Sequence, residues 1–208
     1  MAERNRLNRE ESRAQTRALL MKSAASAFAR NGFEGASVDQ ISEGAGFSRG
    51  AFYSNFSDKE AIFLELLRRH LDRDLAAFEK TIAKSDTLDD LARNVGARYR
   101  DLGDNPDWCL LSSEFQLFIS RGGRQDGAFF RAYAEYRADL TRLIEQAFER
   151  FGFHGELSAT ELASALIGLS HGLALERAAT GSALPMETTG RALRALLFGA
   201  AAGPGERT

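Results

Sequence analysis

Two short helices joined by a tight glycine turn are predicted within residues 37–59, and this feature constrains the fold more than any other part of the chain. Ser37 is followed three residues later by Gln40, which is the spacing of a capping box at a helix N-terminus. Gly44 and Gly46 then end this helix, because glycine accepts a positive φ at no steric cost. A second helix starts only a few residues further on, so the two must pack at an angle.

The second helix is predicted to begin after Ser48, which can serve as its N-cap. Phe52 and Phe56 are four residues apart, so both should face the interior. The opposite face then carries Arg49, Gly50, Ala51, Tyr53 and Asn55. Such a face on the second helix of a helix-turn-helix is typical of proteins that read the major groove of DNA. We therefore expect a DNA-binding regulator.

The segment from Thr16 to Leu67 resembles the DNA-binding domain of TetR/AcrR-family transcriptional repressors. The residues that carry the resemblance are Thr16-Arg17, Ala24-Ala25, Phe28, Gly32-Phe33, Ser37-Val38, Ile41, Ala45-Gly46-Phe47-Ser48, Gly50, Tyr53, Phe56 and Lys59-Glu60. They occur in order and with the spacing of the family, so the match is specific. Ser42 replaces the usual alanine, and Asn55 stands where histidine is common. Both departures bear on the DNA sequence that is read and not on the family.

The resemblance implies a set of DNA contacts: Ser37, Ser48, Arg49, Gly50, Ala51, Tyr53, Asn55 and Lys59. Arg49 would face base edges, where its guanidinium can pair with guanine through two hydrogen bonds. Tyr53 would bond a phosphate, and Ser37 and Lys59 would hold phosphates at helix N-termini. Two alternatives stay open. Ser37 and Ser48 could act only as caps, and Tyr53 could be a packing aromatic.

Hydrophobic periodicity predicts about nine helices and no β-rich region. The expected fold is all-α, with an N-terminal three-helix helix-turn-helix domain followed by a C-terminal helical domain, and the resemblance implies that the second domain binds a ligand and dimerises. The predicted domains are residues 1–57 and 58–202, with a tail at 203–208. The predicted helices cover residues 12–31, two segments within 37–57, and 58–83, 88–102, 107–121, 125–151, 158–180 and 187–201. Only three prolines occur, none of them before Pro106, which favours long helices.

Charge and composition bear on the cellular compartment of the chain and on its attraction to DNA. Residues 1–31 hold seven basic and three acidic side chains, whereas the whole chain has a net charge of −2. A basic arm beside a helix-turn-helix suits the phosphate backbone, although it could also be a solvated tail. A single cysteine excludes an internal disulfide and fits a reducing compartment. No apolar run is long enough to span a bilayer, and the N-terminus lacks the apolar core of a signal peptide. We expect a cytoplasmic protein with no membrane partner.

The last two predicted helices are rich in small and aliphatic residues and need an apolar partner. The resemblance implies that they form a four-helix bundle with the same helices of a second copy. The predicted interface consists of Leu162, Leu166, Leu169, Leu173, Leu193, Leu196 and Leu197. A homodimer of this kind would bind double-stranded operator DNA of near-palindromic sequence. The alternative is that both helices pack only within one chain.

The resemblance also implies a pocket for a small-molecule effector of unknown identity. The predicted lining is aromatic with two polar groups: Trp108, Phe115, Phe118, Phe129, Phe130 and Tyr133, with Glu114 and His171. Because pockets are mostly apolar with few polar groups, this set predicts a small apolar or aromatic effector. These aromatic residues could instead belong to the core, and His171 could be structural or lie in the dimer interface.

An enzyme is not expected. The three histidines lack the spacing of metal ligands, and no glycine-rich phosphate loop is present. Cys109 lies in an apolar segment and is interpreted as a small hydrophobic residue. We predict no catalytic residue, no metal and no cofactor. The regulator is expected to be a repressor, and an activator or a regulator without a ligand is the alternative.

Overall fold

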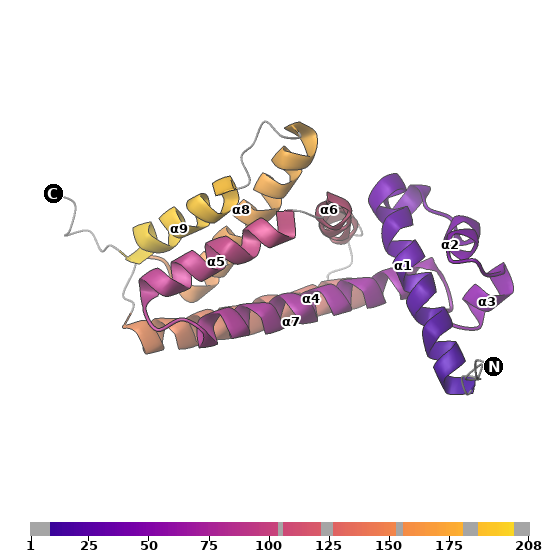
Figure 1. The fold of residues 1–208 in the computed structure, drawn as a ribbon, viewed down its shortest axis with the longest axis horizontal. Helices are drawn as coiled ribbons and strands as arrows, with labels where there is room; N and C mark the ends of the chain where they lie inside the picture. Colours follow the sequence, from indigo (N-terminus) through magenta and orange to yellow (C-terminus); the bar gives the residue numbers. More distant parts are fainter. Residues whose placement is uncertain (1–8, 104–105, 122–126, 153–155, 181–186, 202–208) are drawn as a thin grey trace, which may run out of the picture. The chain divides into compact units, whose positions relative to one another are not determined.

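The computed structural model describes residues 9–103, 106–121, 127–152, 156–180 and 187–201, with only the backbone described at 9, 99–103, 106–109, 189 and 198–201. Over these ranges the chain forms nine α-helices and no strand (Figure 1). The predicted all-α fold is therefore confirmed. The chain divides into a first unit that ends at Leu67 and a second unit that begins at Arg68.

The first unit is built on three helices and the start of a fourth: α1 (Arg9–Gly35), α2 (Val38–Gly44), α3 (Arg49–Tyr53) and α4 (Lys59–Ala83). Its core is a cluster of large apolar side chains with no exposed area, which includes Leu20, Phe28, Ile41, Phe52, Ile62 and Phe63. The rings of Phe28 and Phe33 each lie 4.7 Å from that of Phe63. Burial of this apolar surface holds the short helices in place, because helices of five and seven residues are not stable alone.

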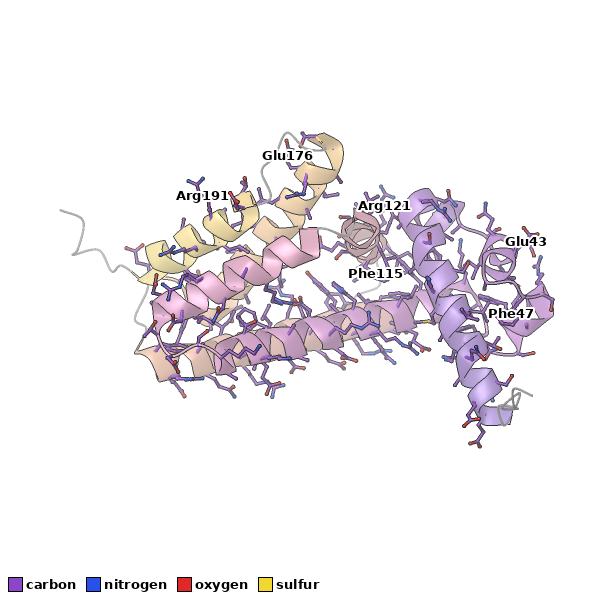
Figure 2. All side chains as sticks on the ribbon, in the orientation of Figure 1. Glu43, Phe47, Phe115, Arg121, Glu176 and Arg191 are labelled. Carbon is purple, nitrogen blue, oxygen red and sulfur yellow. The ribbon has the colours of Figure 1, made fainter. Side chains whose placement is uncertain are left out.

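Two glycines with positive φ shape this unit. Gly32, with φ of 70° and ψ of 173°, puts a kink in α1 just before its end. Gly46, with φ of 76°, forms the turn between α2 and α3. Both values lie where a Cβ atom is disfavoured, so glycine is required at these two points. Phe47 follows in the same turn and is half-buried at the corner (Figure 2).

Arg17 ties the end of α3 to α1 and α4. Its guanidinium pairs with Glu65 of α4 and donates a hydrogen bond to the carbonyl of Asn55, just after α3. It also lies 4.0 Å above the ring of Phe56. A planar cation can make all three contacts at once, whereas lysine could not. The position of α3 is therefore fixed by contacts within the first unit.

The second unit contains the rest of α4 and five further helices: α5 (Leu88–Gly103), α6 (Pro106–Arg121), α7 (Ala128–Phe151), α8 (Ala159–Thr180) and α9 (Glu187–Ala201). α5 and α9 lie side by side, and α8 packs against α6, α7 and α9 (Figure 1). A capping box stands at the start of α8, where Glu161 N donates to Ser158 Oγ at 3.3 Å and Ser158 N donates to Glu161 Oε2 at 2.9 Å. Arg150 of α7 caps the end of α4 by donating to the carbonyls of Ile82 and Ser85.

Two glycines allow α5 and α9 to approach closely. A Cβ atom on Gly190 of α9 would lie 2.6 Å from the carbonyl oxygen of Gly96 on α5. We therefore expect Gly190→Ala to force the helices apart and to lower the free energy of unfolding by about 1–3 kcal/mol. Chemical denaturation measures this change. Gly168→Ala is the matched control, because its Cβ meets nothing within 4 Å. Equal stability of both variants would contradict the close contact.

Candidate functional site

The outer face of α3 is polar and exposed, with one large aromatic side chain on it. Arg49 and Gly50 are exposed, Ala51 is half-buried, and 47% of Tyr53 is open to solvent. The opposite face carries Phe52, which is fully buried, as the spacing predicted. An exposed tyrosine next to an arginine is typical of a surface that binds another molecule.

Arg49 is held in place by two neighbours. Its Nη1 lies 3.1 Å from a carboxylate oxygen of Asp39 on α2, and its Nη2 lies 3.4 Å from the hydroxyl of Tyr53. The guanidinium also lies 5.6 Å from the centre of the Tyr53 ring. The hydrogen bond to Tyr53 and the charge of Asp39 both raise the pKa of Arg49. Its other N–H donors still point to solvent, where they could meet an acceptor.

Gly50 is not required by the packing of the chain. Its φ is not positive, and a Cβ atom there would meet only the Ser48 hydroxyl, at 3.7 Å. Glycine inside a helix costs roughly 1 kcal/mol relative to alanine. A close approach by another molecule to the backbone of α3 would explain why a glycine stands here.

Ser37 and Ser48 are the N-caps of α2 and α3. The Ser37 hydroxyl accepts a hydrogen bond from Gln40 N at 3.1 Å, and the Gln40 side chain accepts one from Ser37 N at 3.0 Å. The Ser48 hydroxyl accepts from Ala51 N at 3.3 Å. The predicted caps are confirmed. Each hydroxyl accepts in these bonds, so its own hydrogen can still be donated to a phosphate.

Lys59 and Asn55 are half-buried and make contacts within the protein. Lys59 Nζ donates to the carbonyls of Phe33 at 2.7 Å and Ala36 at 3.1 Å, and it lies over the Phe33 ring. Asn55 donates its amide to the carbonyl of Ala51 at 2.9 Å, and its Oδ1 is buried. Both side chains thus stabilise the end of a helix, and the DNA contacts predicted for them stay predictions.

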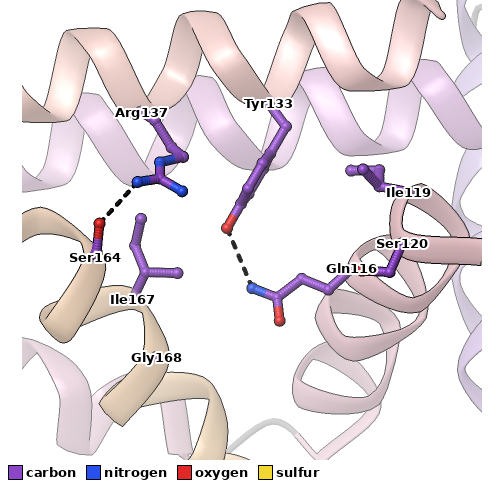
Figure 3. A pocket seen from close by; sticks show the side chains of 8 residues that line it. All are labelled: Gln116, Ile119, Ser120, Tyr133, Arg137, Ser164, Ile167 and Gly168. Atoms are coloured by element: carbon purple, nitrogen blue, oxygen red, sulfur yellow. Dashed lines mark hydrogen bonds between the residues drawn. The ribbon is translucent and has the colours of Figure 1, made fainter. Parts of the chain in front are cut away.

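A cavity of about 310 Å³ lies between α6, α7 and α8 in the second unit (Figure 3). Each helix contributes one face. The lining residues are Gln116, Ile119 and Ser120 of α6, Tyr133 and Arg137 of α7, and Ser164, Ile167 and Gly168 of α8. The volume is at the lower end of the range for small-molecule sites.

Two hydrogen bonds cross this cavity between helices (Figure 3). Arg137 donates to the Ser164 hydroxyl at 2.7 Å, and Gln116 donates to the Tyr133 hydroxyl at 3.3 Å. Burial raises the pKa of Tyr133, and the hydrogen bond from Gln116 and the charge of Arg137 oppose that shift. Tyr133 therefore stays a neutral hydroxyl near neutral pH.

Behind the cavity, a chain of polar side chains leads to α4. His171 of α8 has its Nδ1 3.2 Å from the amide nitrogen of Gln116, and its Nε2 lies 3.0 Å from the Ser112 hydroxyl. That hydroxyl lies 3.5 Å from Nε2 of His70 on α4. Four side chains from three helices thus connect the wall of the cavity to α4. Polar chains of this kind respond together when one member changes.

Burial lowers the pKa of His70 from its ordinary value of 6.5 to about 4, with the charges of His171, Arg98 and Arg73 acting in the same direction and Asp74 opposing them. Between these two values the folded chain binds fewer protons than the unfolded chain. Stability is therefore complete above about pH 6.5 and falls as the pH drops towards 4, by about 2–3 kcal/mol. Urea unfolding of wild type and His70→Gln should show this loss in wild type only. Parallel pH profiles of the two proteins would contradict it.

Comparison with known proteins agrees with the site on α3. Residues 20–66 match the model of the bacterial regulatory proteins of the tetR family. The HTH-type transcriptional repressor Rv1474c of Mycobacterium tuberculosis is 31% identical over 141 residues, which cover 68% of each chain. The chain belongs to the TetR family. It is therefore a transcriptional regulator with a helix-turn-helix, and not an enzyme.

Solved structures of TetR-family regulators share the fold. SCO4454, a TetR-family transcriptional regulator from Streptomyces coelicolor, has a TM-score of 0.70 at 19% identity, over 91% of this chain and 97% of that one. The regulator FadR from Bacillus subtilis, solved in complex with stearoyl-CoA, has a TM-score of 0.69 at 15% identity, over 88% and 98% of the two chains. At these identities the likeness extends to the fold alone.

Two of the residues predicted to line an effector pocket of this TetR-family chain lie at this cavity: Tyr133 lines it, and His171 contacts Gln116 of its wall. Phe118 and Phe129 pack against each other with ring centres 4.6 Å apart, and Phe115 is buried. Glu114 is half-buried and Phe130 is 40% exposed, and neither lines the cavity. The side chain of Trp108 lies outside the described residues.

Sequence reasoning missed most of the lining. The signal that could have found it is a pair of polar residues four apart on one helix face, as with Gln116 and Ser120 on α6 and Tyr133 and Arg137 on α7. Such pairs share one helix face, and a polar face inside a helical body needs a polar partner or a ligand.

The leucines predicted for a dimer interface fall into two groups. Leu162, Leu166, Leu193 and Leu197 are at most 5% exposed within the single chain, so they have almost no surface left to bury against a second copy. Leu169, Leu173 and Leu196 are half-buried and keep some surface.

Among the described residues, no three histidine, cysteine, aspartate or glutamate side chains gather as a metal-binding group. None of the helices in the same part of the chain has the length and apolar character needed to cross a membrane.

Proposed function

We propose that this TetR-family chain is a repressor that binds a palindromic operator as a homodimer and releases it when a small molecule occupies the cavity. We assign DNA binding to residues 1–57, and ligand binding and dimerisation to residues 58–202. The observation that carries the proposal is the exposed face of α3, where Arg49 and Tyr53 stand beside a glycine that the protein's own packing does not need.

DNA contact is proposed for α3 and the two serine caps. Arg49 would pair with a guanine in the major groove, with Gly50 and Ala51 against the base edges. Tyr53 would donate to a phosphate, and Ser37 and Ser48 would donate from the two helix N-termini, where the helix dipole already favours an anion. The basic residues before α2 would add electrostatic attraction that depends on salt.

Dimerisation is proposed through α8 and α9. α8 carries apolar or small residues around its whole circumference, although only one side of it is buried within the chain. A helix that is apolar on all sides requires a second partner. Leu169 and Leu173 keep surface on this helix, and Leu175 is 44% exposed. A two-fold dimer would place the two copies of α3 on half-sites about one helical turn of DNA apart.

Effector binding is proposed for the cavity between α6, α7 and α8. FadR, which has this fold, was solved with a small molecule, and the relative Rv1474c is named a repressor. A ligand that displaces the Gln116–Tyr133 bond would disturb the polar chain through His171 and Ser112 to His70. Because α4 also contributes residues to the first unit, it is the element through which the ligand would act.

The test is a selection of bound fragments from random DNA with the purified full chain, followed by gel shifts on the fragments recovered. We expect an inverted repeat with two half-sites about one helical turn apart. DNA upstream of the chain's own gene should be included as a candidate operator. Recovery of fragments without a shared sequence, at low salt and without ligand, would overturn the proposal.

Asp39 should lower the affinity of the chain for DNA and at the same time fix the orientation of Arg49. Its carboxylate pairs with Arg49 and stands on the same exposed surface as the proposed phosphate contacts. Asp39→Asn is therefore expected to tighten binding to random DNA by about two- to fivefold and to lower the preference for the operator, since Arg49 loses a fixed direction. Glu43→Gln removes one exposed charge from the same helix and is the control. If both variants gain equally, the Asp39–Arg49 pair has no special role.

A further inference from the structure

The cavity between α6, α7 and α8 contains one formal charge, and it is positive. Of its lining residues, Arg137 alone is ionised, and the others are neutral polar or apolar groups. No carboxylate stands among them. One cation and no anion in the lining favour a ligand that carries negative charge.

Arg137 has no carboxylate partner in the described part of the chain. Its Nη2 donates to the Ser164 hydroxyl at 2.7 Å, and that hydroxyl passes its own hydrogen to the carbonyl of Thr160 at 2.9 Å. Two other arginines of α7 differ. Arg142 pairs with Asp139, and Arg150 donates to carbonyls at the end of α4. Arg137 therefore keeps most of its donors free beside the cavity.

Neutral hydrogen-bonding groups stand around this cation. Arg137 and Tyr133 are one helical turn apart on α7 and point into the same space, towards Ser164 and Gln116 (Figure 3). A guanidinium with hydroxyl and amide groups nearby is the arrangement that binds a planar carboxylate, because the two oxygens can accept from the fork of N–H donors.

Apolar surface completes the cavity. Ile119 of α6 and Ile167 of α8 contribute aliphatic side chains to its wall, and at Gly168 a Cβ atom would meet nothing within 4 Å. The volume of about 310 Å³ suits a small molecule. The site thus combines one cationic end with an apolar wall, whereas the sequence predicted an aromatic lining with Glu114 and His171 as its polar groups.

We propose that the effector of this chain is a small monocarboxylic acid with an apolar body, whose carboxylate binds Arg137 and Ser164 and whose body packs against Ile119 and Ile167. This inference rests on the proposed function in taking the cavity as the effector site. It adds the chemical class of the ligand and the residue that selects it.

The test is calorimetric titration of the full chain, without DNA, with three acids and their primary amides: octanoate, phenylacetate and 3-phenylpropanoate against octanamide, phenylacetamide and 3-phenylpropanamide. Each pair has the same shape and differs in charge. We expect at least one acid to bind wild type about tenfold or more tightly than its amide. Arg137→Gln should lose that preference and keep its affinity for the amide. Arg142→Gln, an exposed arginine of the same helix, should behave as wild type.

Three results would overturn the inference: no acid binds wild type at millimolar concentration, acid and amide bind equally, or Arg137→Gln keeps the preference for the acid. Thermal unfolding of Arg137→Gln shows whether the variant is folded, and a folded protein is expected because Arg137 is exposed. Gel shifts on selected DNA are run in parallel. If wild type binds an acid but binds no DNA in the absence of acid, the proposed regulator is contradicted. If wild type binds DNA but no acid, only the carboxylate site is contradicted.

Discussion

Replacing Asp74 by alanine is expected to lower the free energy of unfolding of the second unit by about 3–5 kcal/mol. The Asp74 side chain on α4 is 12% exposed and pairs with Arg98 of α5, which is 11% exposed. It also accepts a hydrogen bond from the Tyr136 hydroxyl of α7 at 2.7 Å. Removing the carboxylate takes away the ion pair with Arg98 and the acceptor of the Tyr136 hydroxyl, so three helices lose a common contact.

Urea denaturation followed by helical circular dichroism measures this effect. Asp72→Ala is the matched control, because Asp72 lies on the same helix and is exposed. The double variant Asp74→Leu/Arg98→Met should recover much of the loss, since both charges are then removed together. A change for Asp74→Ala within about 1 kcal/mol of the Asp72→Ala value would show that the pair is solvated in solution.

Arg49→Ala is expected to remove most of the discrimination between operator and random DNA, by about tenfold to a hundredfold. Arg49 is the one long cationic side chain on the exposed face of α3, and Asp39 and Tyr53 fix its direction. Loss of a base contact changes the preference among sequences, whereas loss of a phosphate contact weakens binding to all of them. Equilibrium titrations on both DNAs at one salt concentration measure the ratio.

Tyr53→Phe is the comparison for this prediction. It removes the hydroxyl proposed to bond a phosphate, which also accepts from Arg49, and leaves the exposed ring and the Asp39–Arg49 pair in place. Its affinity should fall for both operator and random DNA, and the ratio between them should stay much closer to the wild-type value than that of Arg49→Ala. If Arg49→Ala also lowers both affinities equally, Arg49 contacts the backbone and the base contact proposed here is wrong.

Local sequence signals predicted the helices well. The capping boxes at Ser37 and Ser158 were visible as pairs of residues three apart, and both are present. α8 and α9 have the predicted ends, while α7 begins at Ala128 and not near residue 125. Caps and glycine turns act within a few residues, so a single sequence contains the information that places them.

The internal hydrogen bonds of Lys59 and Asn55 could not be predicted from such local signals. Lys59 donates to carbonyls 23 and 26 residues earlier in the chain, at the end of α1. The side-chain amide of Asn55 donates to the carbonyl of Ala51, while the backbone carbonyl of Asn55 accepts from Arg17 of α1. These contacts depend on how α1 meets α3 and α4, which helical periodicity does not specify.

Most of the lining of the cavity was missed for a similar reason. Aromatic residues were expected to line an effector pocket, yet the rings of Phe118 and Phe129 pack edge to face against each other, and Phe115 is buried. The lining comes from three helices, and its members are identified only when those helices are placed side by side. The same holds for Leu162 and Leu193, which are buried inside the chain, although they looked like residues of a dimer interface.

We propose that a dimer of this chain reads two half-sites of DNA through α3. The most direct measurement is fluorescence anisotropy of the full chain on the selected inverted repeat and on the same DNA with one half-site scrambled, at physiological salt. We predict that scrambling one half-site weakens binding by at least about a hundredfold, because several base contacts are lost together. Equal affinity for the two DNAs would contradict the claim.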